Sequence, residues 1–208
     1  AFSFQYWFKT GNTSAYTSVF STFSTIATRG YESFMQFGRL GLALIANSGS
    51  NIHLYVSTQR AFADNQWHNA AIVYDGSSNP SNVKFFIDGV EEPITIVGNA
   101  LSSGSIKNTN PLVLGKRLDN SAVQFVGQMD NLSIWNTTLS SAQIINNINT
   151  NPTSNTQNLV AFYNFNQGPN PGSTNLGNTT LLNISTVSGL NGTLSGFGLV
   201  STFSNWVS

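Results

Sequence analysis

The chain has 208 residues, zero net charge and no cysteine, and only 8% of its residues are charged. Without cysteine there is no disulfide framework, no thiolate zinc site and no cysteine nucleophile. Without a Lys/Arg cluster, neither nucleic acid nor an anionic membrane is an expected partner, and no apolar run approaches the roughly 18 residues of a membrane-spanning helix. Fifteen Phe, six Tyr and four Trp supply a hydrophobic core. Because disordered chains are poor in aromatic residues, we expect an ordered domain.

The first predicted strand, residues 2–9, begins almost at the first residue. Its sequence FSFQYWFK alternates strictly, with aromatic side chains on one face and Ser3, Gln5, Trp7 and Lys9 on the other. This alternation is typical of a half-buried strand. The strand has no lead-in, and the first residues lack the basic region and cleavage site of a signal peptide. We therefore expect the chain to be part of a longer protein with neighbouring domains.

Eleven more short strands are predicted, separated by turns of Gly, Asn, Ser and Pro. They span residues 18–27, 33–38, 40–47, 51–57, 69–75, 82–88, 93–98, 111–116, 127–136, 159–166 and 192–200. The one predicted helix lies near residues 140–149, where Ser140 and Gln143 have the spacing of a capping box before a short stripe of isoleucines. Residues 166–180 are expected to form a long loop. Many short strands at regular spacing predict an all-β sandwich or barrel.

Residues 66–92, QWHNAAIVYDGSSNPSNVKFFIDGVEE, contain one of the two histidines and four of the eight acidic residues. The segment could hold a metal or acid–base centre, or it could be two strands joined by a turn. Asp88-Gly89 has the composition of a tight hairpin turn, because both residue types tolerate positive φ, and Asp75-Gly76 ends its strand in the same way. We therefore predict a hairpin in which these aspartates form turns. His68, with no second ligand nearby in the sequence, is predicted to be structural.

Three blocks of the sequence resemble one family. They are WHNAAIVYDGSSNPSNVKFFIDGVEE, PLVLGKRLDNSAVQFVGQMDNLSIWNTTLSSAQI, and NLVAFYNFNQG with the terminal SNWV. In this order they resemble laminin-G-like and pentraxin-like domains of large secreted or cell-surface bacterial proteins, over roughly residues 2–207. The resemblance implies an all-β, concanavalin A-like jelly-roll sandwich of two antiparallel sheets with one short helix near 140–149. It also implies a single laminin-G-like domain over residues 1–208.

No arrangement typical of catalysis on such a fold is present in the sequence. Retaining glycosidases need two carboxylates about 5 Å apart, and the Glu-x-Asp-x-Glu pattern that would present them on one strand is absent. Glu91 and Glu92 would point to opposite faces of a strand, and the resemblance makes Asp130 a structural position. Neither histidine shows a partnered Asp or a nucleophile-elbow glycine pattern. We expect no enzymatic activity and no catalytic residue.

The resemblance implies one candidate metal site, for Ca²⁺. Laminin-G-like domains commonly place one carboxylate before a central strand and another before the strand that matches GQMDN, while backbone carbonyls complete an oxygen shell suited to calcium. The carboxylates at these places are Glu32 and Asp119. Lys116 and Arg117 add positive charge beside them. The competing interpretation is therefore a solvated ion pair between Arg117 and Asp119.

Ligand recognition on this kind of sandwich depends on rim loops or on an exposed aromatic face, where sugar rings stack and Asn, Asp and Arg side chains orient them. The aromatic residues most expected to escape the core are Trp7, Tyr16, Tyr31 and Trp67. The predicted ligand-binding residues are Tyr31, Arg117, Asp119 and Asn120.

These features predict a non-catalytic recognition or adhesion module, extracellular or at the cell surface, that binds glycans or another cell-surface ligand such as a protein. The first alternative is a structural spacer domain of a large adhesin or filament, without a soluble ligand. The second, with less support, is a glycoside hydrolase acting on polysaccharide.

Overall fold

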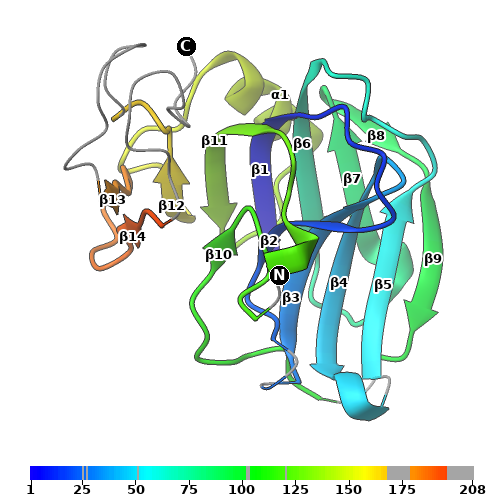
Figure 1. The fold of residues 1–208 in the computed structure, drawn as a ribbon. Helices are drawn as coiled ribbons and strands as arrows, with labels where there is room; N and C mark the ends of the chain where they lie inside the picture. The colour runs from blue at the N-terminus through cyan, green and yellow to red at the C-terminus, as the bar shows by residue number, and fades with distance from the viewer. Residues whose placement is uncertain are drawn as a thin grey trace.

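Two antiparallel six-stranded sheets face each other in the structure, a computed structural model that describes residues 1–24, 26, 28–50, 52–101, 104–119, 121–167 and 179–195 (Figure 1). Sheet A has the order β12 (Leu159–Tyr163), β11 (Gln128–Trp135), β1 (Phe2–Lys9), β6 (Trp67–Tyr74), β7 (Val83–Ile87) and β8 (Val90–Glu92). Sheet B has the order β10 (Val113–Leu114), β2 (Thr17–Ser21), β3 (Gly30–Gln36), β4 (Arg39–Asn47), β5 (Ile52–Thr58) and β9 (Ile94–Asn99). The predicted jelly-roll sandwich is thus confirmed.

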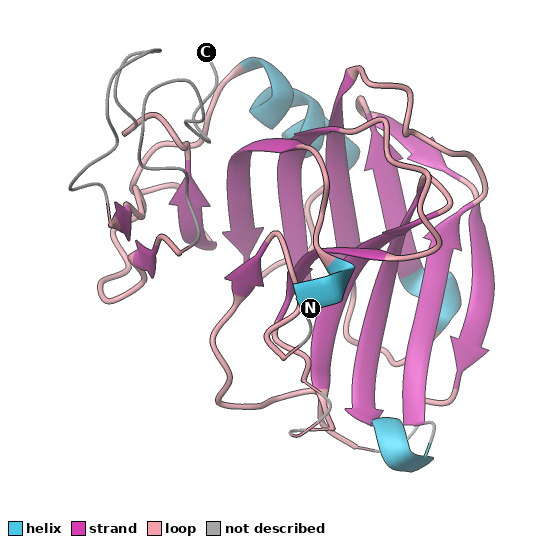
Figure 2. Ribbon diagram, in the orientation of Figure 1, coloured by secondary structure: helices cyan, strands magenta, loops and turns pink. Residues whose placement is uncertain are grey.

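The other elements are short. Strands β13 (Thr180–Leu181) and β14 (Gly192–Thr193) form a separate two-stranded sheet. The single α-helix of the described residues, α1, spans Ser141–Asn149, and the 3₁₀ turns are η1 (Ser48–Ser50), η2 (Pro80–Asn82) and η3 (Ser121–Val123). Strand therefore dominates the fold, as Figure 2 shows. No helix in the described part of the chain is long and apolar enough to cross a membrane.

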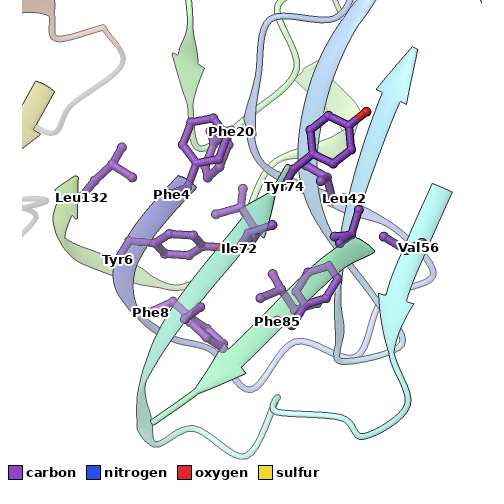
Figure 3. Close-up of a cluster of buried hydrophobic side chains, with 14 of the residues drawn as sticks. Phe4, Tyr6, Phe8, Phe20, Leu42, Val56, Ile72, Tyr74, Phe85 and Leu132 are labelled. Carbon is purple, nitrogen blue, oxygen red and sulfur yellow. The ribbon is translucent and has the colours of Figure 1, made fainter. Parts of the chain in front are cut away.

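The core lies between the two sheets because alternate residues of each strand point inward. Figure 3 shows its members, which come from both sheets: Phe4, Tyr6, Phe8, Ile72, Tyr74, Phe85 and Leu132 from sheet A, and Phe20, Leu42 and Val56 from sheet B. The buried Tyr6 hydroxyl lies 3.1 Å from Ser33 Oγ. Burial raises the pKa of Tyr6 far above its ordinary value, and the hydrogen bond with Ser33 only partly opposes this.

Helix α1 covers the outer face of sheet A. Ser140 caps it, and both hydrogen bonds of the predicted capping box with Gln143 are present. Ile144 is fully buried against the sheet, whereas Ile145 is 48% exposed, so the predicted apolar stripe is narrower than expected. Gln5 joins the sheet to the helix, because its Nε2 donates to the Ile144 carbonyl at 3.0 Å and its Oε1 accepts from Asn147.

The hairpin predicted within residues 66–92 is confirmed. Strands β6 and β7 pair antiparallel, and Ile72 lies opposite Phe85. Asp88 (φ +53°) and Gly89 (φ +83°) form the tight turn from β7 into β8, where two successive positive φ values match the twist of the strands. Glu91 and Glu92 do point to opposite faces of β8, since Glu92 is buried and Glu91 is exposed.

The sequence prediction missed or misjudged several strand ends. Strand β8 has three residues, too few to show alternation, and β13 has two. The strand predicted over 111–116 is only Val113–Leu114, since Pro111 has no N–H to donate and Gly115 turns at φ +80°. Strand β2 ends at Ser21, whose hydroxyl accepts from the backbone N–H of Phe23. Residues 168–178, most of the predicted loop, and residues 196–200 of the last predicted strand lie outside the described residues.

Gly41 is predicted to be the least replaceable glycine of sheet B. A Cβ added there would overlap the Phe34 ring, which lies across it on the outer face. We expect Gly41→Ala to lower the free energy of unfolding by about 1–3 kcal/mol in a urea titration, because the ring cannot move without disturbing its neighbours. Gly49→Ala is the matched control, since its Cβ would make only an ordinary contact with Asn47. Equal stability of the two variants would contradict this account.

Candidate functional site

His68, the histidine of the 66–92 segment, has two acidic partners that the sequence did not reveal. Its Nδ1 lies 2.8 Å from Asp88 Oδ2, and its Nε2 lies 3.1 Å from Asp64 Oδ1. Asp88 also accepts from the backbone N–H of Asn69 through its other oxygen. The expectation that neither histidine has a partnered aspartate was therefore wrong, because Asp64 and Asp88 reach the ring from two separate turns.

This arrangement favours the protonated imidazole, in which both ring nitrogens donate to carboxylates. Burial of the ring opposes protonation and is the largest single effect on the His68 pKa. The hydrogen bonds and charges of Asp88 and Asp64 together outweigh it, and they raise the pKa above 6.5. The ring also packs edge-on against Phe62, so His68 is structural, as predicted.

The outer face of sheet B carries a row of three stacked rings, called here the aromatic row: Tyr16, Phe34 and Tyr55. Phe34 lies between the other two, with ring centroids 5.0 Å from Tyr16 and 4.6 Å from Tyr55 and interplanar angles of 15° and 22°. Alternation along β3 and β5 places Phe34 and Tyr55 on this face. Tyr16 comes from the loop that enters β2. Phe34 is fully covered, whereas the two tyrosines keep part of their surface in solvent.

A buried ion pair lies beside the aromatic row. The Arg117 guanidinium binds Glu32 through two hydrogen bonds, Nε to Oε1 at 3.3 Å and Nη2 to Oε2 at 2.9 Å. The Glu32 side chain is 1% exposed and that of Arg117 is 17% exposed. The guanidinium carbon lies 5.5 Å from the centre of the Tyr16 ring and 5.1 Å from that of Phe23. Paired charges with so little solvent are costly to bury, and this pair fixes the orientation of the arginine.

The hydroxyls of the aromatic row are held in their neutral form. Burial, followed by the charge of Glu32, raises the pKa of Tyr55 to about 12, and Arg117 opposes the shift. The same effects, with a hydrogen bond to Glu32, raise the pKa of Tyr16 still further. The Tyr55 hydroxyl donates to Gln36 Oε1 at 3.2 Å. Both phenols can therefore donate and accept hydrogen bonds at neutral pH.

The structure does not bring all the predicted site residues together. Glu32 and Arg117 meet on the outer face of sheet B, as just described. Tyr31 faces the opposite way, into the core, with its ring 5.5 Å from that of Phe4. Asp119 is exposed on the loop after Arg117, and Asn120 lies outside the described residues.

The Glu32 site, as arranged, does not fit a calcium ion. Both carboxylate oxygens are bound by Arg117, and a cation would have to displace a guanidinium that is itself nearly buried. No cluster of three or more acidic or histidine side chains suited to a metal is present among the described residues. Arg117 forms a buried ion pair with Glu32, and the solvated pair of Arg117 with Asp119 stays a prediction. Whether calcium binds elsewhere near Asp119 is tested by the melting experiment below.

The sequence analysis missed Phe34 and Tyr55 as members of this face, although a signal for both was available. Glu32, Phe34 and Gln36 are spaced by two residues, although the predicted strand began only at residue 33, and His53, Tyr55 and Ser57 alternate along another predicted strand. Since one carboxylate of the first set was already a candidate, period-two alternation alone places the other residues on its face.

The pH dependence of stability tests the His68 arrangement. Because the folded pKa lies above the unfolded value of 6.5, the stabilisation is fully present below pH 6.5 and is lost as the pH rises through the folded pKa. We expect the melting temperature of the wild type, measured relative to His68→Gln, to fall across this range. A constant difference between the two proteins would contradict a protonated His68.

The Arg117–Glu32 pair should respond differently to single and double replacement. Arg117→Met leaves a buried carboxylate without a partner, so we expect a loss of about 3 kcal/mol in the free energy of unfolding. The double variant Arg117→Met/Glu32→Gln should recover part of this loss in the same urea titration.

We also expect equal melting temperatures of the wild type in calcium and in chelator. A melting temperature several degrees higher in calcium than in chelator would instead support the predicted calcium site.

Residues 1–145 match the family model Laminin_G_3, the concanavalin A-like lectin/glucanases superfamily. No curated protein matches the chain in sequence.

Solved structures share the fold. A Bacteroides ovatus protein described as carbohydrate-binding superposes with a TM-score of 0.62 at 12% identity, over 88% of this chain and 48% of its own. A pentraxin of Limulus polyphemus gives 0.53 at 17% identity, over 70% of this chain and 68% of its own. The CBM40 domain of a Ruminococcus gnavus sialidase gives 0.52 at 15% identity, over 70% and 80%. This chain thus spans about half the length of the Bacteroides protein.

At these identities the likeness concerns the fold, whereas the family model covers well over half of the sequence. The assignment of residues 1–208 to a single domain stays a prediction beyond residue 145. The chain belongs to the concanavalin A-like lectin/glucanase superfamily, as a laminin-G-like domain.

Proposed function

We propose that the chain is a non-catalytic carbohydrate-recognition module of an extracellular or cell-surface protein. The observation that carries the proposal is the aromatic row on the outer face of sheet B, with the fixed Arg117 guanidinium beside it. Partly exposed tyrosine rings offer apolar surface for the C–H face of a sugar. Their hydroxyls and the amide of Gln36 offer hydrogen bonds to its hydroxyl groups.

The rigidity of this face favours recognition. The Phe34 ring is held between two others, and Arg117 is held by Glu32, so a ligand would meet groups that are already in place. Binding to pre-ordered side chains avoids the entropy cost of immobilising them. The fold likeness to a protein described as carbohydrate-binding and to a sialidase CBM40 domain supports the same class of ligand.

The placement of the carboxylates supports a module without catalysis. Glu91 and Glu92, the closest acidic pair in sequence, point away from each other, and each binds its own cation, Lys84 or Arg60. Both nitrogens of His68 are occupied by carboxylates. The Glu32 carboxylate is neutralised by Arg117. A retaining mechanism needs two free carboxylates at close range, and these groups do not supply them.

A glycan array followed by calorimetry tests the function. We expect binding of at least one glycan class, and a loss of affinity of about tenfold or more in Tyr55→Ala, since aromatic truncation at the centre of a binding face is costly. Tyr55→Phe is the matched control, because it keeps the ring and removes only the hydroxyl. Melting curves show that both variants fold.

Three outcomes count against the proposal. Silence across a broad array favours the structural spacer, a domain of an adhesin or filament with no soluble ligand. Release of reducing sugar from a polysaccharide panel would favour a glycoside hydrolase. An unchanged affinity in Tyr55→Ala would remove the aromatic row from the binding face.

A further inference from the structure

A second surface lies on the other side of the sandwich, between the outer face of sheet A and the C-terminal end of α1. It is a hollow of about 540 Å³, open to solvent, and a size in the range of small-ligand sites. Its lining includes two tryptophans, one aspartate and three asparagines: Trp7, Trp67, Asp130, Asn131, Asn149 and Asn151. None of these residues belongs to the aromatic row or contacts Arg117.

The two tryptophans are neighbours on one face of the sheet. In the register of β1 and β6, Trp7 lies opposite Asn69 and Lys9 lies opposite Trp67, so the two indoles are diagonal partners. Diagonal positions on one face are within reach of aromatic side chains. Trp67 is 39% exposed and Trp7 is partly exposed. Two adjacent, partly exposed indoles that line one hollow form an apolar patch of the kind found at ligand-binding sites.

A bulge in β11 brings polar groups to the tryptophans. The pairing of β1 with β11 shifts between Gln5 and Trp7, so that Asp130, not Asn131, lies opposite Trp7. Asn131 takes a left-handed conformation, φ +50°, at this bulge. Bulges redirect side chains and are common beside binding sites. This bulge sends Asp130 and Asn131 into the hollow beside an indole.

Both bulge residues have side-chain oxygens that can accept further hydrogen bonds. The amide oxygen of Asn131 is buried and has no hydrogen-bond partner, a state that is unfavourable unless a donor arrives. Asn131 itself lines the hollow. One Asp130 oxygen accepts from the Asn131 backbone N–H at 2.8 Å, and no cation pairs with Asp130 in the described part of the chain. Burial raises the pKa of Asp130, although the hydrogen bond from the Asn131 backbone N–H acts to lower it.

The charge of the hollow selects the kind of ligand. Asp130 is the one charged group in its lining, and the C-terminal end of α1 adds a partial negative charge. A carboxylated or sulfated sugar would be repelled, whereas neutral hydroxyls can donate to Asp130 and to the asparagine oxygens. Lys9 lies across from Trp67 in register but does not line the hollow.

We propose that this hollow is a second saccharide site, which takes an uncharged oligosaccharide stacked on Trp7 and Trp67 and hydrogen-bonded to Asp130 and the asparagines. It is separate from the aromatic row and does not depend on it. A quaternary ammonium group would also suit two indoles and an acid. The three asparagine amides, which such a cation cannot use, favour the sugar.

The indole N–H signals of tryptophan in ¹H–¹⁵N NMR spectra test the proposal directly. The chain has four tryptophans, and Trp7→Phe and Trp67→Phe assign the two that matter. The probes are cellohexaose, mannohexaose, xylohexaose, laminarihexaose and chitohexaose, with hexagalacturonate and phosphocholine as contrasting ligands. We expect at least one neutral hexasaccharide to shift the Trp7 and Trp67 signals in a saturable way. Hexagalacturonate should not shift them.

The variants separate this site from the proposed function. Trp67→Ala should weaken binding of the responding hexasaccharide by about tenfold or more, and Asp130→Asn, which keeps the shape, should weaken it without unfolding the protein. Tyr55→Ala, on the opposite face, should leave the Trp7 and Trp67 shifts intact even if all binding at the aromatic row is lost. The proposal is overturned if no neutral hexasaccharide shifts these signals at millimolar concentration. A response to phosphocholine alone, or an equal response to hexagalacturonate, overturns it as well.

Discussion

The alternation of side chains along β1 is the constraint on which the rest of the molecule depends. This strand lies inside sheet A, between β6 and β11. Its inward residues Phe4, Tyr6 and Phe8 enter the layer between the sheets. Its outward residues reach α1 through Gln5 and the hollow through Trp7. A shift of one residue in register would exchange these faces and remove three aromatic rings from the layer between the sheets.

The ion pair of Arg117 and Glu32 shows how a surface can be made rigid without a metal. Loops that cross a sheet face need something to hold them, and in many proteins a cation bound by oxygen ligands does so. Here a guanidinium from the loop after β10 inserts between Tyr16 and Phe23 and binds a carboxylate of β3. The positive charge is covalently part of the chain, so its position does not depend on ion concentration.

Much of the architecture was predictable because it rests on local patterns. Strict alternation identified β1, the Asp88-Gly89 turn identified the hairpin, and Ser140 with Gln143 identified the start of α1. The candidate site was less predictable, because its residues meet through pairings between distant segments. Arg117 and Glu32 are 85 positions apart, and Asp64 reaches His68 from a separate turn. Tyr31 was misplaced because the strand was predicted to begin at residue 33, whereas β3 begins at Gly30, so Tyr31 alternates with Glu32 and faces the core.

The two outer faces of the sandwich point in opposite directions, and this has a consequence for valency. Sheets stacked about 10 Å apart, each with its own outer side chains, separate the aromatic row from the hollow by the full thickness of the domain. A short glycan held on one face cannot fold back to reach the other. A domain that binds glycans on both faces would join two separate glycan chains instead of binding one glycan chain at two points. Its apparent affinity would grow with the density of glycan chains around it. Such a domain is better suited to binding a network of glycan chains than to binding a single soluble sugar.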